Sequence, residues 1–308
     1  MTPRILLIGK NGQIGSALAP LLAPLGPLTA LGRSDLDLAN PDDIRRAISS
    51  LRPLIIVNAA AYTAVDRAEA EEPLARTINA DAPAVIAEEA RKIGAFLVHY
   101  STDYVFDGRS RSPYTESDST NPVNAYGRTK LAGEEAIRNS QVPHLILRTA
   151  WVYATSGKNF LLTILRLAAE RDELRIVNDQ FGAPTWSREI AAATARLLNP
   201  FCTSELALEE FAALSGTYHL TAAGQTTWHD FALSILDESS RLSHQPPWLA
   251  AATAGRPLHA KIVPIPTADY PTPSLRPAYS VLSNARFTST FGFALSDWRA
   301  QLASAFRS

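Results

Sequence analysis

Short, continuous apolar runs alternate with longer segments of helical periodicity along the first half of the chain. Such runs are typical of strands that are buried on both faces of a parallel sheet. Strands of this kind are predicted at Ile5–Ile8, Leu28–Leu31, Leu54–Asn58, Ala95–Tyr100 and His144–Thr149. Because a helical segment separates each strand from the next, the pattern predicts an α/β fold with a Rossmann-type, doubly wound parallel sheet.

Helical periodicity fills the segments between these strands and continues beyond them. Helices are predicted at Ile14–Leu25, Pro41–Leu51, Pro73–Ile93, Ala125–Asn139, Asn159–Arg171, Ser187–Leu198 and Trp228–Ser239, with a last helix from Ser296. Asn40 and Asn124 precede two of them and have the side chain of an N-cap residue.

The order of elements is less regular beyond Tyr153. Further strands are predicted at Leu174–Val177, Thr217–Leu220, which returns to the main sheet, and Lys261–Ile265. We assign residues 1–170 and 186–222 to a dinucleotide-binding domain. Residues 171–185 and 223–308 then form a smaller, partly interleaved α/β substrate-binding domain.

Composition places the chain among ordinary globular proteins. It has 308 residues, 46% of them hydrophobic, and a net charge of −1, so no bulk charge attracts nucleic acid or acidic lipid. The lone Cys202 excludes a Cys-rich metal site and fits a reducing cytoplasm. The apolar run after Met1 is too short for a signal-peptide core. No run approaches the ~18 residues of a membrane span. We expect a cytoplasmic protein without nucleic-acid or membrane partners.

A glycine-rich loop joins the first strand to the first helix. Glycines at this position let the backbone turn sharply, so that amides at the helix N-terminus can hold a pyrophosphate. The spacing is Gly-x-x-Gly-x-x-Gly, which only approximates the general dinucleotide fingerprint. The predicted cofactor-binding residues of this loop are Gly9, Asn11, Gly12, Gln13, Ile14 and Gly15.

The tips of the second and third strands carry further candidates for cofactor binding. Arg33 and Ser34 suit a 2′-phosphate better than bare ribose hydroxyls, which favours NADPH and leaves NADH as an alternative. The residues expected to flank the adenine are Asp37 and Leu38. Small residues after the third strand either lie flat against the cofactor or simply pack on the sheet, and they are Ala60, Ala61, Tyr62 and Thr63.

The start of the helix at Ala125 carries the candidate chemistry. Tyr126 and Lys130 lie one helical turn apart, on one face. A tyrosine hydroxyl has a reference pKa of about 10. The helix N-terminus, the Lys130 ammonium and an oxidised nicotinamide ring would all lower that pKa. Thr102, at the tip of the fourth strand, is expected to converge with Tyr126 on one substrate oxygen.

Two residues outside these motifs are candidates for substrate binding. Trp151, just past the fifth strand, would form an apolar wall for a ring-shaped substrate, although a place in the sheet core is equally compatible with its position. Arg276, in a proline-rich segment, is either a clamp for a diphosphate or an ordinary loop arginine.

Several segments together resemble the extended short-chain dehydrogenase/reductases, and among them most closely the dTDP-4-dehydrorhamnose reductases. They are Asn58–Asp66, Ser101–Phe106, Tyr126–Glu134, Arg148–Tyr153 and Asn178–Thr185. The resemblance implies reduction of a 4-keto sugar carried on dTDP, with Tyr126 as proton donor. It further implies that Lys130 binds the nicotinamide ribose and lowers the tyrosine pKa. Thr102, Asp103 and Trp151 would contact the substrate.

The sequence departs from the resemblance in one place. Some relatives carry glutamates that bind a metal between subunits, and the corresponding residues here are Ala17 and Arg188. We therefore expect no metal site, and any homodimer to form without a metal link.

Two rival functions remain open from the sequence. A nucleotide-sugar 4,6-dehydratase or 4-epimerase shares the fold, but the dehydratases resemble one another in a Thr-Asp-Glu, and here Tyr104 follows Asp103. The second rival is an NADP-binding regulatory subunit that resembles the β subunit of methionine adenosyltransferase. Intact Thr102, Tyr126 and Lys130 favour an enzyme over a binding subunit.

Overall fold

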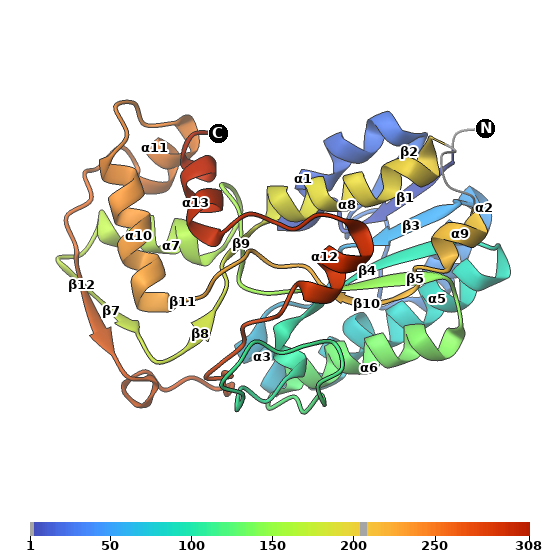
Figure 1. Ribbon diagram of the computed structural model, residues 1–308, viewed down its shortest axis with the longest axis horizontal. Helices are drawn as coiled ribbons and strands as arrows, with labels where there is room; N and C mark the ends of the chain where they lie inside the picture. Colours follow the sequence, from blue (N-terminus) through green and yellow to red (C-terminus); the bar gives the residue numbers. More distant parts are fainter. Residues whose placement is uncertain (1–2, 204–207) are drawn as a thin grey trace.

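The computed structural model, which describes residues 3–203 and 208–308, has a larger part centred on one sheet and a smaller part beside it (Figure 1). The sheet has six strands in the order β10-β5-β4-β3-β1-β2, and every neighbouring pair is parallel. The strands are β1 (Ile5–Ile8), β2 (Leu28–Leu31), β3 (Ile55–Asn58), β4 (Phe96–Thr102), β5 (His144–Thr149) and β10 (Gly216–His219). The chain runs outward from β1 to β2 and then crosses to β3, so β1 and β3 flank a topological switch point. The Rossmann-type fold is confirmed.

Alternate residues of the buried strands face two separate helical layers. On one face, Ile5 and Leu7 of β1 pack in a cluster with α1 (Gln13–Leu22) and α8 (Ser187–Cys202). On the other, Leu6 and Ile8 pack with α2, α5 and α6. The remaining helices of this part are α2 (Pro41–Leu51), α5 (Ala82–Lys92), α6 (Ala125–Ser140), η1 (Ala23–Leu25), α3 (Val65–Ala70), α4 (Glu72–Arg76), η2 (Thr77–Asp81), η3 (Asp103–Val105), α9 (Leu208–Ala212) and α12 (Ala285–Phe291).

The helix predicted at Pro73–Ile93 is wrong as a continuous α-helix. Its middle, Thr77–Asp81, is a π-helical turn between α4 and α5. Pro83 has no amide hydrogen to donate to the carbonyl of Asn79, which an α-helix would require, and a widened turn removes that requirement. The widened turn also turns the Asn79 side chain toward the loop after β3.

The smaller part has its own apolar core around Trp298 and Phe231, both fully buried. Its elements are α7 (Phe160–Ala168), α10 (Trp228–Ser240), α11 (Pro247–Thr253), α13 (Trp298–Phe306), η4 (Thr267–Asp269) and the paired strands β7 (Glu173–Val177) with β12 (Lys261–Ile265), β8 (Phe181–Gly182) with β11 (Thr226–Thr227), and β6 (Val152–Tyr153) with β9 (Thr185–Trp186). Because α7 packs in this core although it precedes residue 170, the domain boundaries given above stay predictions.

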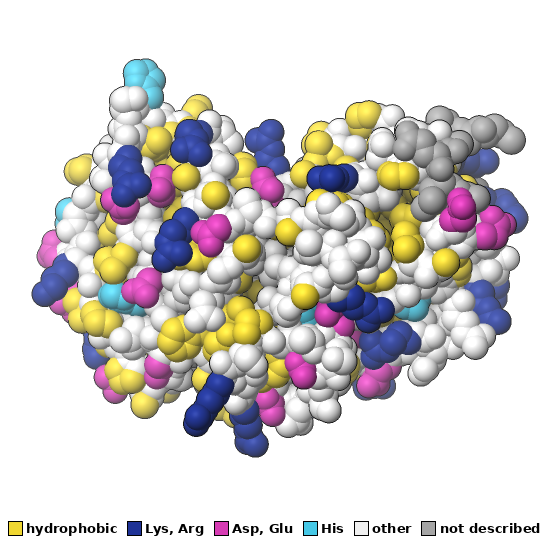
Figure 2. Space-filling view, viewed as in Figure 1, with side chains coloured by type: hydrophobic (Ala, Val, Ile, Leu, Met, Phe, Trp, Pro, Cys, Tyr) yellow, Lys and Arg dark blue, Asp and Glu magenta, His cyan; other side chains and the backbone are white. Residues whose placement is uncertain are grey.

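Basic and acidic side chains are interspersed over the face displayed in Figure 2. None of the helices within residues 3–203 and 208–308 combines the length and the apolar character that spanning a membrane requires.

A buried ion pair ties α6 to the sheet. Glu134 accepts from Nε and Nη2 of Arg148 on β5, at 2.9 and 2.7 Å, and from the Ser101 hydroxyl. Burial alone would raise the pKa of Glu134, but the hydrogen bonds and charge of Arg148, with help from Ser101 and Arg138, hold it below its usual value. This stabilisation is present above the carboxyl's ordinary pKa and is lost as the pH falls through the lowered one.

We expect Glu134→Gln to lower the free energy of unfolding by about 3–5 kcal/mol, because it leaves the buried Arg148 guanidinium without its counter-charge. Denaturant unfolding monitored by circular dichroism measures the change. Glu135→Gln, at the exposed neighbouring position, is the control and should stay within about 0.5 kcal/mol of the wild type. Equal effects of the two substitutions would contradict the role of the ion pair.

Candidate active site

The candidate residues gather at one edge of the sheet. Strands β1 to β5 are parallel, so their carboxyl ends meet at the same edge. The glycine loop follows β1, the Arg33 turn follows β2, and the small-residue loop follows β3. Thr102 ends β4, and Trp151 follows β5. Residues that are far apart in sequence are thereby placed along one side of the molecule.

The glycine loop lies directly against the loop after β3. Gly9 has φ +92°, and a Cβ there would lie 2.7 Å from the amide nitrogen of Ala60. A Cβ on Gly15 would meet the Gly9 carbonyl oxygen at 2.0 Å, which explains why both positions need glycine. Asn11 and Gly12 are exposed at the N-terminus of α1, and Ile14 packs against the core below.

Gln13 has one buried polar atom without a partner. Its Nε2 donates to the Val152 carbonyl at 3.3 Å, whereas its Oε1 is buried and makes no hydrogen bond within the described chain. A buried acceptor of this kind is costly unless a ligand or water satisfies it. It therefore supplies a hydrogen-bond acceptor beside the glycine loop.

The turn after β2 presents exposed polar side chains. Arg33 and Ser34 are both exposed, and Asp35 beside them forms an ion pair with Lys10 of the glycine loop at 2.9 Å. Asp37 is exposed and accepts from the amide of Ala39, while Leu38 packs against the core. Two basic side chains, Lys10 and Arg33, thus stand near the end of β2.

The π-helical turn holds the loop after β3 in place. The Asn79 side chain accepts from the amide of Tyr62 at 2.8 Å and donates to the Tyr62 carbonyl at 3.0 Å. It also donates to the Thr129 hydroxyl on α6. Ala60 and Ala61 are half-buried and Thr63 is exposed, so this loop offers mainly backbone to its surroundings.

Tyr126 and Thr102 come together at the start of α6. Asn124 caps the helix by accepting from the amide of Gly127 at 2.8 Å. Burial raises the pKa of Tyr126 to about 12, and a hydrogen bond with the Thr102 hydroxyl partly offsets this. In the chain by itself, burial therefore outweighs the lowering that the sequence predicted. A neutral phenol beside a hydroxyl can bind one oxygen atom and give it a proton.

Lys130 lies almost entirely below the surface, with 2% of its area exposed. Its Nζ donates to the Tyr100 carbonyl at 2.7 Å and lies 3.2 Å from Nε2 of His99, both on β4. Burial lowers the pKa of Lys130 to about 8, with a small opposing effect of Glu134.

Asp103 is buried next to Thr102. Its Oδ1 accepts from the Thr102 hydroxyl at 3.0 Å, and its Oδ2 has no partner within the described residues. Burial raises the pKa of Asp103 to about 6, against hydrogen bonds from Ser280 and Thr102. The ring of Tyr104, the next residue, meets that of Tyr126 edge-on at 5.6 Å.

Arg276 is engaged by the chain itself. Its Nη1 and Nη2 form a bidentate ion pair with Asp66 at 2.6 and 2.8 Å, and Nη1 also donates to the Ser274 carbonyl. The next carbonyl, that of Leu275, accepts from the Asn124 side chain at 2.8 Å. The segment around Arg276 thus ties the smaller part to α3, through Asp66, and to the cap of α6, through Asn124.

Trp151 forms a second contact between the two parts, through Trp228 of α10. It has φ +46°, a backbone conformation that side chains other than glycine rarely adopt. Its ring stacks on that of Trp228 with centroids 3.4 Å apart and planes within 2°. A Cβ on Gly182 would lie 2.2 Å from the indole, so the pair is packed closely from both directions.

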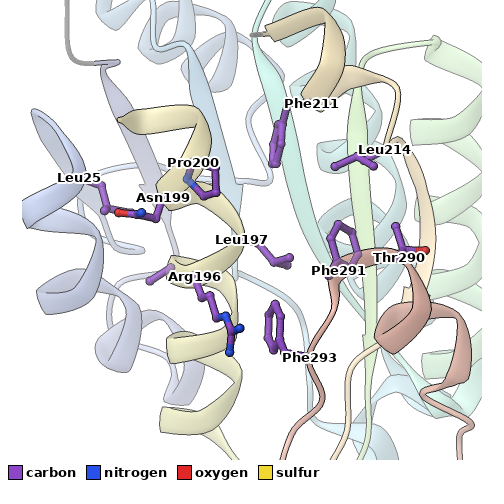
Figure 3. Close-up of a pocket in the computed structure, with 11 residues that line it drawn as sticks. Leu25, Arg196, Leu197, Asn199, Pro200, Phe211, Leu214, Thr290, Phe291 and Phe293 are labelled. Atoms are coloured by element: carbon purple, nitrogen blue, oxygen red, sulfur yellow. The ribbon is translucent and has the colours of Figure 1, made fainter. Parts of the chain in front are cut away.

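A pocket of about 560 Å³ lies away from this edge, between α8, α9 and α12 (Figure 3). Its walls are largely apolar, with Phe211, Phe291 and Phe293 prominent, and it contains none of the residues predicted from the sequence.

Several residues of the site were not singled out from the sequence. They are Asp66, Asn79, His99 and Trp228. Each of them acts through a partner that is distant in sequence. Only His99 had a local sequence signal, because it is a polar residue within an otherwise apolar strand. Across residues 3–203 and 208–308, no cluster of three or more His, Cys, Asp or Glu side chains is arranged to hold a metal ion.

The chain matches the family described as RmlD substrate binding domain over residues 3–308. It is 48% identical to a dTDP-4-dehydrorhamnose reductase of Burkholderia thailandensis over 96% of this chain and 95% of that one. It is 45% identical to the enzyme of the same name from Escherichia coli K12, over 96% and 94%. A solved dTDP-4-dehydrorhamnose reductase from Bacillus anthracis, in complex with NADP, superposes with a TM-score of 0.85 at 30% identity, over 100% and 99% of the two chains. The chain therefore belongs to the RmlD substrate binding domain family, together with these dTDP-4-dehydrorhamnose reductases.

Proposed function

We propose that the protein reduces the C4 keto group of dTDP-4-dehydro-6-deoxy-L-mannose (dTDP-4-dehydrorhamnose) with NADPH to give dTDP-L-rhamnose, the last step of dTDP-rhamnose biosynthesis. The observation that carries the proposal is the neutral Tyr126 phenol beside the Thr102 hydroxyl at the carboxyl edge of the sheet. The names of relatives that match nearly the whole chain support the same reaction.

The residues at the edge fit a dinucleotide. The glycine loop exposes Asn11 and Gly12 at a helix N-terminus, which suits a pyrophosphate. The unpartnered Oε1 of Gln13 offers an acceptor, and Arg33 with Ser34 would receive a 2′-phosphate. The NADP complex of the Bacillus anthracis relative agrees with NADPH as the cofactor, and NADH is an alternative donor.

In the reaction, bound NADPH supplies the hydride that the sugar C4 accepts. Negative charge then develops on the C4 oxygen, and Tyr126 gives its proton to that oxygen as general acid. A pKa of about 12 keeps the phenol protonated at neutral pH, as this direction of reaction requires. Thr102 stabilises the same oxygen, after its hydroxyl turns away from Asp103.

The phenolate left on Tyr126 has Lys130 one turn further along the same face of α6. A positive charge on Lys130 stabilises the phenolate until a proton from water restores the phenol. Asp103 and Trp151 are proposed to contact the sugar. Arg276 would bind the diphosphate only if it exchanged part of its pairing with Asp66 for the ligand.

We further propose that the protein is cytoplasmic and that any homodimer forms without a bridging metal. The thiol of Cys202 is buried and free, which suits a reducing compartment. Arg188 is exposed with its guanidinium over the ring of Trp186, and neither it nor Ala17 offers a carboxylate.

Mixing the pure protein with NADPH and enzymatically prepared dTDP-4-dehydrorhamnose, while following the absorbance of the reduced cofactor, tests the proposal. We expect oxidation of NADPH and formation of dTDP-L-rhamnose, identified by NMR. A flat trace with authentic substrate would favour the rival function of an NADP-binding regulatory subunit. A dehydrated or epimerised product would favour the other rival.

Tyr126→Phe should lower kcat by about 10²–10⁴, because only the general acid is removed. The Kd for NADPH, measured by fluorescence titration, should change by less than about threefold, since the ring is kept. Tyr218→Phe is the control, because its hydroxyl binds the Leu214 carbonyl beside β10, away from the candidate edge. Near-normal turnover of the Tyr126 variant would exclude the assigned role.

Arg33→Ala should lower kcat/KM for NADPH by about 10–100-fold, because it removes a charge-assisted hydrogen bond to the 2′-phosphate. The value for NADH should stay within about twofold, since NADH lacks this phosphate. Steady-state kinetics with both cofactors measure the ratio. Arg91→Ala, an exposed arginine at the end of α5, is the matched control. Parallel losses with NADPH and NADH would contradict the assignment.

A further inference from the structure

A buried hydrogen-bonded chain extends from Lys130 into the sheet. Nζ of Lys130 lies 3.2 Å from Nε2 of His99, and Nδ1 of His99 lies 3.1 Å from Nδ2 of Asn58. His99 and Asn58 are register partners on β4 and β3, with 0% and 1% of their areas exposed. Because these side chains are buried and bonded to one another, each shared hydrogen must sit on a definite donor atom and face a definite acceptor.

The orientation of the Asn58 amide is fixed by the loop after β3. The backbone amide of Ala60 donates to Oδ1 of Asn58 at 3.2 Å. The opposite atom, Nδ2, is a donor and faces Nδ1 of His99. A flipped amide would place two donors, Ala60 N–H and Nδ2, against one another. Nδ1 of His99 is therefore the acceptor and carries no hydrogen.

The tautomer of His99 follows from this assignment. Burial, with the nearby charge of Lys130 and of His144, holds the pKa of His99 well below its usual value, so the ring is neutral. A neutral imidazole with an accepting Nδ1 carries its hydrogen on Nε2. That hydrogen points at Nζ of Lys130, which can accept it only as an uncharged amine. The same amine donates one hydrogen bond to the Tyr100 carbonyl.

We propose that His99 is a positioning residue that donates its Nε2 hydrogen to Lys130 and so favours the uncharged amine of Lys130 until the cofactor binds. The Asn58 amide, held by Ala60 of the cofactor loop, selects the tautomer that allows this. The inference rests on the proposed function for its link to NADPH binding, but the tautomer itself depends only on the protein.

Other charges around Lys130 do not reverse this preference. Glu134, one turn along α6, favours the ammonium, but it is already paired with Arg148 and Arg138. Burial dominates and lowers the pKa of Lys130 to about 8. The other ionisable groups on the elements packed against this end of α6 are Tyr126 and Arg128 on α6 itself, Asp66, Arg67 and Glu69 on α3, Glu72 and Arg76 on α4, Asp81 on η2, Asp103 and Tyr104 on η3, and His144 and Arg148 on β5.

The arrangement couples cofactor binding to proton uptake. The phosphates of NADPH favour a charged Lys130, so binding should draw a proton from solvent. An ammonium can donate to His99 only after the ring moves its hydrogen to Nδ1, where it meets the Asn58 amide donor. Charging Lys130 therefore disturbs the contact between Asn58 and the amide of Ala60, which lies in the cofactor loop.

The tautomer is tested directly by ¹⁵N NMR of the ligand-free, histidine-labelled protein at a pH above the Lys130 pKa of about 8, where the amine is uncharged. The chain has six histidines, and His99→Gln identifies the signals of His99. We expect His99 to be neutral with its hydrogen on Nε2. A hydrogen on Nδ1 would overturn the proposal, whether or not the protein reduces a sugar. The wild-type spectrum decides even if the variant folds poorly, because selective assignment through Lys130→Met remains available.

Proton uptake is tested by titration calorimetry of NADPH binding near pH 8 in buffers of different ionisation enthalpy. We expect uptake by the wild type to fall by about threefold in His99→Gln, whose amide oxygen can accept from a charged Lys130. His229→Gln, on α10 in the smaller part, is the matched control and should keep the wild-type value. Equal uptake by His99→Gln and the wild type would contradict the proposal, and circular dichroism checks that each variant is folded.

Discussion

The site depends on the burial of two ionisable groups on one face of α6. Tyr126 is partly buried beside Thr102 at the end of β4, and Lys130 is buried against β4. Desolvation shifts the pKa of each group toward its neutral form. For Tyr126 the shift favours the protonated phenol, which is the form that donates a proton in a reduction. For Lys130 the shift brings the pKa to about 8, so that near this pH part of the population is uncharged and can take up a proton when a phosphate-bearing ligand binds. Desolvation thus sets the starting protonation of both residues, and ligand binding changes the balance.

Burial of this kind is sustained by polar contacts that hold α6 in place. Glu134 and Arg148 fix the middle of the helix to β5, and Asn79 binds Thr129 from the π-helical turn. At the helix start, Asn124 contacts the segment that carries Arg276, and Arg276 in turn is paired with Asp66. The same contacts connect the sheet to the smaller part. A substrate held between the two parts would therefore touch residues whose positions are fixed from both sides.

Much of the fold follows from local sequence, and much of the site does not. The strands, the Asn40 and Asn124 caps and the glycine turn follow from apolar runs and residue chemistry within a few positions. The break between α4 and α5 was missed, because Pro83 near a helix start is ordinary and the π-helical turn depends on packing with Gly133 of α6. The pairings of Arg276 with Asp66 and of Trp151 with Trp228 join positions far apart in sequence, which no periodicity reveals. The raised pKa of Tyr126 follows from its desolvation, which depends on how the whole chain packs around it.

A crystal structure of the protein with NADP⁺ and dTDP-L-rhamnose would test the central claim most directly. The account predicts that the C4 oxygen of the sugar lies within hydrogen-bonding distance of both the Tyr126 phenol and the Thr102 hydroxyl, with C4 facing the nicotinamide above the glycine loop. A sugar bound with its C4 oxygen remote from Tyr126, or a nicotinamide placed away from this edge of the sheet, would contradict it.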